Sequence, residues 1–470
     1  MRQKFASLRR CDRIDAVKKM FFGSMFAAFL LSAGAQEAGT NLNSWISHPL
    51  SLVESLNLAL QQNATILKAK NDLEASHGVV VQTRAVALPH LQANGQYKYT
   101  DPKSIETVSG FGFSQEQSWN GGLRVVQSVY EGGKIVAALR AAKATKQQAL
   151  ANYQTVVADV LLNTRLAYYA VLLAAQQITV HEASVNLLQK ELEDQQHRYN
   201  AGTVPRFNLL RAEVAVANER PNLIRARNAY RVAKNNLANQ LGYNLPREIW
   251  EDIPLNLSDT LEAAPYDVNL PDAIQHALGT RTELTALRKT EELQRVNVVS
   301  AKAGYKPSVQ VFAGYDWFNS RLIAPNDLTH DIRGWNAGAQ LTWDIFDGML
   351  TRGKVIQAEA QHERSQTEIV DQSRQIELEV RTQYSTFIEA REVLESQKTV
   401  QAEAEEALRE ARARTEAGTG TQLEVLDAET ALTQSRTTQI QAVHDYAAAR
   451  ARLERAVGAD LAQPASPTNP

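Results

Sequence analysis

The sequence has little of the chemistry that enzymes and metal sites require. Among 470 residues there are one cysteine, Cys11, and four methionines. The nine histidines show no ligand-like pairing, and no phosphate loop or catalytic triad pattern occurs. A net charge of −2 gives no compositional sign of nucleic-acid binding. We therefore expect neither an enzyme nor a cofactor or metal site, and no disulfide framework.

Long hydrophobic runs are also missing, since no apolar stretch reaches the 18 residues of an ordinary transmembrane helix. The longest lies at 20–31, after a basic segment and before Ala33 and Ala35. This order predicts a secretory signal, residues 1–35, cleaved before Gln36. An uncleaved anchor is the alternative, but twelve apolar residues are too few to span a bilayer core. Cleavage would remove Cys11 and leave 43 bases and 50 acids, a net charge of −7.

The chain repeats itself. Residues 119–242 align without a gap on 335–458, and 14 of the 42 positions in 201–242 are identical in the second copy. The upstream parts match as well, so the units are 51–242 and 269–458. The remaining segments are an N-terminal segment 36–50, a proline-containing linker 243–268 and a disordered tail 459–470.

Each unit predicts the same order of elements. It begins with an amphipathic helix, 51–86 with an interruption near Gln62, or 270–303 without one. Two alternating strands follow, and then a helix of about 67 residues that lacks proline and would be roughly 100 Å long. A glycine turn and a return helix complete the unit. The predicted ranges are strands 89–101, 117–130, 307–318 and 333–346, long helices 134–200 and 350–416, and return helices 206–241 and 421–457.

The strands alternate between an apolar and a polar face, as the stretch WNAGAQLTWDIFDG beginning at Trp335 illustrates. A soluble two-sided sheet would alternate too. However, the chain carries an export signal, and the strands have membrane-crossing length. Four strands cannot close a barrel, and open edges in lipid leave backbone groups unsatisfied. Several chains must then share one barrel: two would give 8 strands and three would give 12, and the polar inner faces favour the wider one.

This ordered set of elements resembles the TolC-type outer-membrane factor family. The resemblance is carried by ALPHLQANGQY and YKPSVQVFAGY at strand entry, by YEGG and FDG at strand exit, and by AGTVPRFNLLRAE and AGTGTQLEVLDAE at the helical turns. It implies a mainly α fold with membrane β: a homotrimer whose 12-stranded β-barrel in the outer membrane of a Gram-negative bacterium continues as a periplasmic α-helical barrel. It also implies two partners, a periplasmic adaptor protein and an inner-membrane pump.

The resemblance also suggests pore residues. The first turn of the return helix carries an acidic ring in the family, and by position Glu424 and Asp427 would supply it here. Asn208 and Arg211 occupy the matching positions of the first copy, so Arg211 is a candidate partner for the ring. A purely structural role stays open, because Thr421 followed by Glu424 fits a capping box.

Two further groups of residues are candidates. The turns sit where family members meet adaptor tips, although turn geometry alone explains glycine there. Aromatic residues near strand ends would form a membrane-interface girdle. The turn residues are Gly202, Thr203, Gly418 and Thr419, and the aromatic residues are Tyr97, Tyr99, Trp119, Tyr315, Trp317, Trp335 and Trp343.

The main prediction is thus the exit duct of an efflux or secretion system, with its cargo undetermined. One rival is a cell-surface coiled-coil protein, structural or adhesive, without a conduit; it would not need polar strand faces. A periplasmic adaptor is a second rival, but it would need a β-rich flanking domain, and no segment of that kind separates the two repeats.

Overall fold

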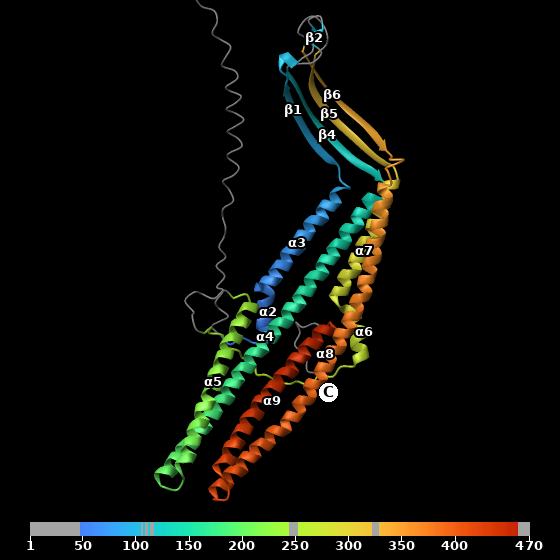
Figure 1. Ribbon diagram of the computed structural model, residues 1–470. Helices are drawn as coiled ribbons and strands as arrows, with labels where there is room; N and C mark the ends of the chain where they lie inside the picture. Colours follow the sequence, from blue (N-terminus) through green and yellow to red (C-terminus); the bar gives the residue numbers. More distant parts are fainter. Residues whose placement is uncertain are drawn as a thin grey trace, which may run out of the picture. The chain divides into compact units, whose positions relative to one another are not determined.

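The computed structural model describes residues 48–104, 107–108, 111–112, 117–243, 252–321 and 329–458. The predicted signal peptide, most of the N-terminal segment, part of the linker and the predicted disordered tail lie outside these ranges. The chain divides into two units, Met1–Pro49 and Leu50–Pro470, and every element below belongs to the second. Figure 1 shows its long helices with the sheet at one end and two helical turns at the other.

Both copies contain the same elements in the same order. The first has α2 (Leu52–Gln62), α3 (Ala64–Ala85), β1 (His90–Tyr99), β4 (Gln117–Glu131), α4 (Lys134–Asn200) and α5 (Arg206–Gln240). The second has α6 (Leu270–Thr280), α7 (Thr282–Lys302), β5 (Ser308–Arg321), β6 (Thr329–Thr342), α8 (Leu350–Glu416) and α9 (Gln422–Val457). Short pieces complete the set: η2 (Pro102–Ser104), β2 (Thr107–Val108), β3 (Phe111–Gly112) and η3 (Ala303–Tyr305). The two long helices match the predicted ranges.

The four long strands form one antiparallel sheet in the order β1-β4-β5-β6. Its register places Asn94 opposite Gly122, Gly122 opposite Asp316, and Gly314 opposite Asn336. Polar residues therefore share one face, while Tyr97, Trp119 and the other predicted apolar positions share the opposite face. A bulge near Val129 lets β4 bend where it approaches α4.

The predicted fourth strand is displaced by four residues. We predicted 333–346 from its alternation, but β6 spans Thr329–Thr342. Pairing ends at Thr342 because the neighbouring strand β5 begins opposite it, at Ser308. Further on, the Asp347 carboxylate accepts a hydrogen bond at 2.8 Å from the backbone N–H of Thr351, in the first turn of α8. Residues 343–349 therefore form the connection to α8, and Trp343 lies just beyond the strand.

The second predicted entry helix is also interrupted. Arg281 has φ −59° and ψ 124°, which separates α6 from α7 where a continuous helix was predicted over 270–303. Its buried guanidinium donates to the carbonyl of Ala456 at 3.1 Å, near the end of α9. At the equivalent position in the first copy, Asn63 separates α2 from α3 and caps α3 through the N–H of Thr65.

The helices pack through small and aliphatic side chains. Around α8 and α9 a core cluster contains Phe387, Leu394, Tyr446 and Leu453, and linker residue Tyr266 packs against it. In the first copy, Leu161 of α4 packs on Leu56 of α2. One stretch within α4 has a mean hydropathy of 1.5, which by length and composition would allow it to cross a membrane, although polar residues interrupt it. Only 39% of that stretch is buried inside the chain.

Near the middle of the helical region, a network of charges joins four helices. Arg455 of α9 contacts Asp159 of α4 at 2.8 Å and Glu283 of α7 at 2.6 Å. Arg281 also contacts Glu283, at 3.0 Å, and Glu379 of α8 at the same distance. A second pair of contacts joins Glu454 of α9 to Arg165 of α4 and to Arg450. Four arginines face four carboxylates, so the charges balance.

Burial raises the pKa of the Glu283 carboxyl, but hydrogen bonds from Arg281 and Arg455 outweigh it and hold the pKa at about 2. Because this pKa is depressed on folding, Glu283 contributes stability above its ordinary value near 4.5. That contribution is lost as the pH falls toward 2. The network thus stabilises the packing of α7 against α9 in a way that depends on pH.

Substituting Glu283→Gln should destabilise the folded protein at pH 7 by about 3 kcal/mol, because two arginines lose a charged partner. The difference in melting temperature between wild type and variant should shrink as the pH falls from 4.5 toward 2. Circular dichroism melts of detergent-purified protein across this range measure it. Glu395→Gln, an exposed acid on α8, should leave the profile unchanged; a constant gap for Glu283→Gln would refute the assignment.

Gly242 ends the first copy in the left-handed region, with φ +78°. A Cβ there would lie 2.3 Å from the carbonyl oxygen of Gln62, where α2 and α3 meet. Gly458 holds the matching position at the end of the second copy, with φ +84°. Each repeat therefore closes on its own entry helices through a residue that must lack a side chain.

We predict that Gly242→Ala lowers the melting temperature, since it adds a left-handed alanine costing about 1–3 kcal/mol and a backbone clash. Gly279→Ala is the matched control, because its Cβ would meet nothing within 4 Å and alanine favours a helix. Thermal unfolding of both variants should give a loss for the first and no loss for the second. Equal melting temperatures would show that the fold accommodates a Cβ at Gly242 without loss of stability.

Candidate functional site

The tip between α8 and α9 is a tight glycine turn. The N–H groups of Thr419 and Gly420 both donate to the carbonyl of Arg414 at 2.9 Å, and Gly418 has φ +76°. In the first copy, Thr203 makes the same bond to Arg198, and Gly202 has φ +73°. These bonds satisfy the terminal carbonyls of the long helices.

A Cβ at either Gly202 or Gly418 would meet nothing within 4 Å. The positive φ values therefore account for glycine at both positions, while the space above them stays open. Turn geometry is thus a sufficient reason for these residues. Contact with another protein at Gly202, Thr203, Gly418 and Thr419 remains a prediction.

Glu424 lies in the first turn of α9. Its N–H donates to the Thr421 hydroxyl at 3.4 Å, and that hydroxyl donates to the Glu424 carboxylate at 3.3 Å. Arg414 of α8 lies 3.4 Å from the same carboxylate. The predicted capping box is therefore formed in part, yet 40% of the Glu424 side chain stays exposed. A structural and a pore-lining role are compatible at this residue.

Asp427 differs from Glu424. It is exposed, and among the described residues no basic group lies within ion-pair distance of it. Three residues along a helix, the two acids share one face, while Gln422, Val425 and Glu429 of the same helix are buried. Both carboxylates thus lie on a face of α9 that the rest of the described chain leaves uncovered.

The candidates from the first copy sit at the matching place on α5. Asn208 and Arg211 are half-buried, and the Arg211 guanidinium lies 5.4 Å from the ring centre of Phe207. Within the described chain Arg211 forms no ion pair with either acid of the second copy. Pairing of Arg211 with an acidic ring would need a neighbouring chain and remains a prediction.

Above the tips, α4 and α9 enclose a polar layer that the sequence did not point to. Glu429 is almost fully buried, and one of its oxygens accepts from Arg412 at 2.9 Å while the other has no partner. Burial is the main reason that its pKa is raised, with Glu191 of α4 adding to it against the effect of Arg412. Ser184 and Thr433 are joined at 3.1 Å one turn higher. This layer adds buried polar contacts between the two hairpins to an apolar cluster, in which Leu187 of α4 packs against residues of α8 and α9 such as Leu432.

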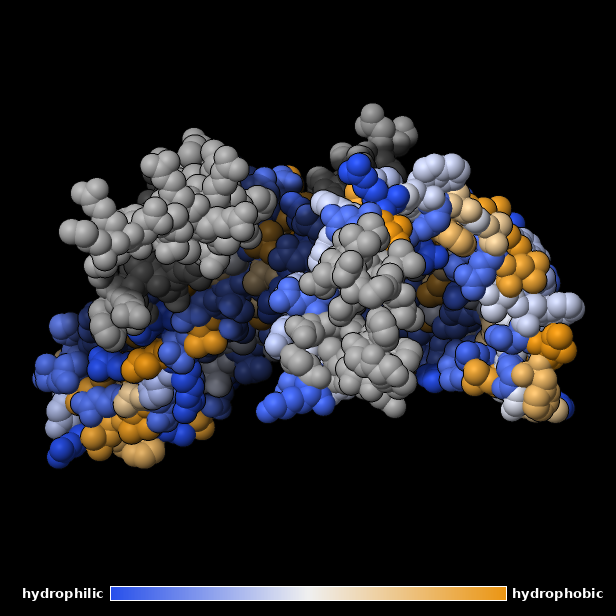
Figure 2. All heavy atoms as spheres, turned by 90° about the horizontal axis from the view of Figure 1, so that it is seen from above, coloured by the Kyte–Doolittle hydropathy of each residue, from blue (hydrophilic) through white to orange (hydrophobic). Residues whose placement is uncertain are grey.

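At the other end, the exposed aromatic residues gather on the apolar face of the sheet. Trp119 and Trp317 meet edge to face with ring centres 5.1 Å apart. Tyr97 lies opposite Trp119 and Tyr315 opposite Trp335 in the register, and Tyr99 follows on the same face. Trp335 is 81% exposed and Tyr97 65%, which is unusual for large apolar groups. Surface hydrophobic side chains are visible in Figure 2.

Trp343 belongs to a different group. It lies past β6, and its ring N–H donates to the carbonyl of Tyr305 at 3.2 Å, near the helical end of the sheet. Ile345 and Phe346 beside it are 86% and 80% exposed. The aromatic residues thus fall at both ends of the strands, as two interfaces of a bilayer would require.

The polar face carries the sheet's hydrogen-bonding side chains. The Asn336 amide donates to the Asp316 carboxylate across β5 and β6. A cavity of about 440 Å³ on this sheet is lined by polar-face residues such as Asn94, Gln96 and Asn120 and also by Trp119 and Trp317. Among the described residues, no group of three or more His, Cys, Asp or Glu side chains could hold a metal ion. The polar side chains of this face are suited to contact water and solutes.

Comparison with known proteins agrees with these features. A family model described as outer membrane efflux protein matches residues 55–243 and 273–459, one match for each repeat. The outer membrane protein TolC of Escherichia coli (strain K12) is 24% identical over 406 residues, covering 84% of this chain and 80% of TolC. The proteases secretion protein PrtF of Dickeya chrysanthemi is 20% identical, covering 83% of this chain and 84% of its own.

A solved structure shares the fold. The outer membrane channel CmeC of Campylobacter jejuni superposes with a TM-score of 0.74 at 15% sequence identity, covering 87% of this chain and 85% of CmeC. The resemblance to the TolC-type family, the mainly helical fold with its four-stranded sheet, and the outer-membrane location are confirmed. The chain belongs to the outer membrane efflux protein family.

Proposed function

We propose that three copies of this chain form a channel-tunnel that passes solutes passively from a periplasmic adaptor and an inner-membrane pump to the exterior. The observation that carries the proposal is the open sheet. Its edge strands β1 and β6 each have one unpaired side within the described residues, and its apolar face is exposed. Three four-stranded sheets joined edge to edge give 12 strands and a lumen wide enough for water.

The helices support the same arrangement. α4 and α8 each have 67 residues, so at about 1.5 Å per residue they extend roughly 100 Å beyond the sheet. Many exposed apolar residues on them, such as Leu139 and Leu378, have no cover within the chain. Neighbouring chains would cover them and continue the barrel as a helical wall. A surface coiled coil without a conduit would account for the helices but not for the two-faced sheet.

An efflux duct and a secretion duct are both compatible with this geometry. Names of both kinds occur, since the matching family is described as outer membrane efflux protein and PrtF is called a proteases secretion protein. The tips of the hairpins are the surfaces we assign to the adaptor, through Gly202, Thr203, Gly418 and Thr419. Passive conduction is consistent with the described residues, which offer polar walls.

At the mouth, we propose that Glu424 and Asp427 from three chains form a ring of six carboxylates. The uncovered face of α9 and the unpaired Asp427 support this placement. Such a ring would attract cations and bind divalent ions across the opening. Arg414, which touches Glu424, would moderate the field of that residue but not of Asp427.

Purified protein should run as a heat-modifiable trimer on a gel and conduct ions across a planar bilayer. The Glu424→Ala, Asp427→Ala double variant should lose most cation selectivity, and divalent block should weaken about tenfold. Thr421→Ala is the matched control, because it removes the helix cap and keeps both carboxylates. Unchanged selectivity in the double variant would refute the carboxylate ring. A monomer that conducts nothing would refute the channel.

A further inference from the structure

A second charged region lies far from the mouth, where the sheet meets the long helices. A cavity of about 660 Å³ opens there between the first residues of β5, the last residue of β6, the end of α7 and the starts of α4 and α8. Three of its lining residues, Ser308, Gln310 and Thr342, belong to the polar face of the sheet. The cavity thus opens on the face opposite to the aromatic residues.

Lysines dominate its wall. Lys134, Lys306 and Lys354 line it together with two carboxylates, Glu131 and Asp344. Among the described residues no ion pair within 4 Å involves any of these three lysines, whereas nearby Lys302 is paired with Glu359 at 2.8 Å. Asn297, Ser300 and Thr351 add further hydrogen-bond donors. The wall therefore holds three ammonium groups without an ion pair and two carboxylates, an excess of one positive charge, with neutral donors between them.

Arg124 extends this region along the sheet. Its guanidinium carbon lies 4.6 Å from the ring centre of Phe312. The ring lies over Gly338 of β6, where a Cβ would come within 2.9 Å of it. Glycine at 338 therefore lets the ring lie against the sheet, and the ring holds the guanidinium over its face. Arg124 is exposed and, within the described chain, has no carboxylate partner.

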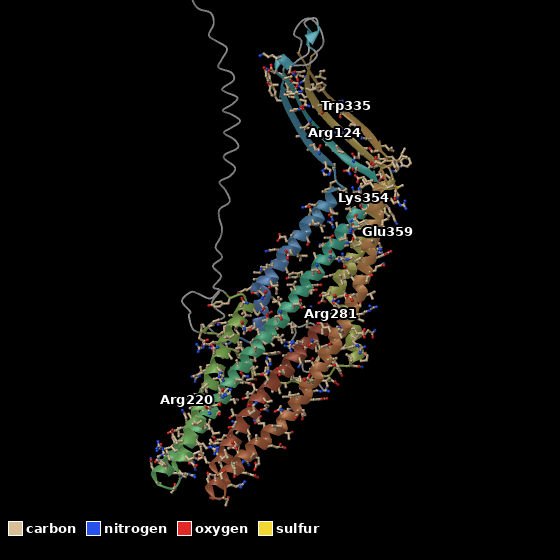
Figure 3. The ribbon with its side chains drawn as sticks, in the orientation of Figure 1. Arg124, Arg220, Arg281, Trp335, Lys354 and Glu359 are labelled. Carbon is tan, nitrogen blue, oxygen red and sulfur yellow. The ribbon has the colours of Figure 1, made fainter. Side chains whose placement is uncertain are left out.

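The register connects the two features. Arg124 lies opposite Gly314 on β5, and Gln310 at the cavity lies four residues further along that strand. At about 3.3 Å per residue this is roughly 13 Å, and the guanidinium already reaches the Phe312 row between them. In Figure 3, Arg124 lies on the sheet and Lys354 at the top of α8. Asp316, an acid of the polar face two residues beyond Gly314 on β5, accepts a hydrogen bond from the neutral Asn336 amide.

We propose that this strip, from Arg124 to the three lysines, is an anion-binding site inside the barrel for solutes that carry phosphate, sulfate or clustered carboxylate groups. The inference rests on the proposed trimer, in which the polar face becomes the lumen. Guanidinium and ammonium groups are the usual donors to such oxygens. Three copies would give the barrel base a cationic girdle, opposite in sign to the acidic mouth.

Planar-bilayer recordings of the trimer test the site, with sodium tripolyphosphate added to the extracellular side. From that side the polyanion reaches the barrel without passing the acidic mouth. Wild-type channels should be blocked at low concentration. Both Arg124→Gln and the double variant Lys306→Gln, Lys354→Gln should weaken the block about tenfold and lower the anion-to-cation permeability ratio.

Lys98→Gln is the matched control. Lys98 lies on the same face of the sheet, opposite Ser118, without an aromatic ring beneath it. It should leave the block within about twofold of wild type. An equal effect of Lys98→Gln would overturn the proposal, because it would show a diffuse lumen charge rather than a site.

The two proposals fail in different ways. A wild-type trimer that conducts ions but is not blocked by tripolyphosphate overturns the anion site alone. A sample that forms no trimer and no channel overturns the proposed function instead. Gel mobility of each variant separates a lost site from a lost assembly. If the double lysine variant does not assemble, the comparison of Arg124→Gln with Lys98→Gln decides the case.

Discussion

The unpaired edges of the sheet constrain everything else in this protein. β1 and β6 each present a row of backbone N–H and C=O groups that the described chain leaves without a strand partner. In a hydrocarbon layer each such group costs several kcal/mol, so the sheet is stable there only when other strands complete it. The exposed tryptophans and tyrosines on one face suit lipid, and the amides on the other suit water. The closed multi-chain barrel proposed above would satisfy both faces and both edges.

Much of this architecture could be predicted from local patterns. Two-residue alternation located the four strands, and the absence of proline over 134–200 and 350–416 located the long helices. The errors occur where a tertiary contact decides. Arg281 breaks the entry helix because its guanidinium is needed at the end of α9, a contact 175 residues away. The strand stops at Thr342 because its partner β5 begins at Ser308, the residue opposite Thr342.

The candidate sites also differ in how far the sequence alone predicts them. Glu424 and Asp427 were placed by position through the family resemblance, because they follow a turn whose sequence is distinctive, and their ring stays a prediction. The Arg124–Phe312–Gly338 stack could not be placed in this way, since its members lie on three strands and meet only through a register set by the folded sheet. The balanced charges around Glu283 were equally hidden, because each acid and base looks like a solvated helix residue in the sequence. Their partners come from four helices.

Duplication explains how one backbone supports two chemistries. Gly242 and Gly458 close the repeats alike, and both long helices begin after a left-handed residue, Gly133 or Met349. The tips differ, because the first copy places Asn208 and Arg211 where the second places two acids. In a trimer, six hairpins of nearly equal length would then alternate in charge around the mouth. Within the described chain Arg211 pairs with neither acid, so under the proposed trimer only contacts between neighbouring chains would bring the acids to the arginine. Opening the mouth would then separate opposite charges at those contacts, which a ring of identical acidic tips would not provide.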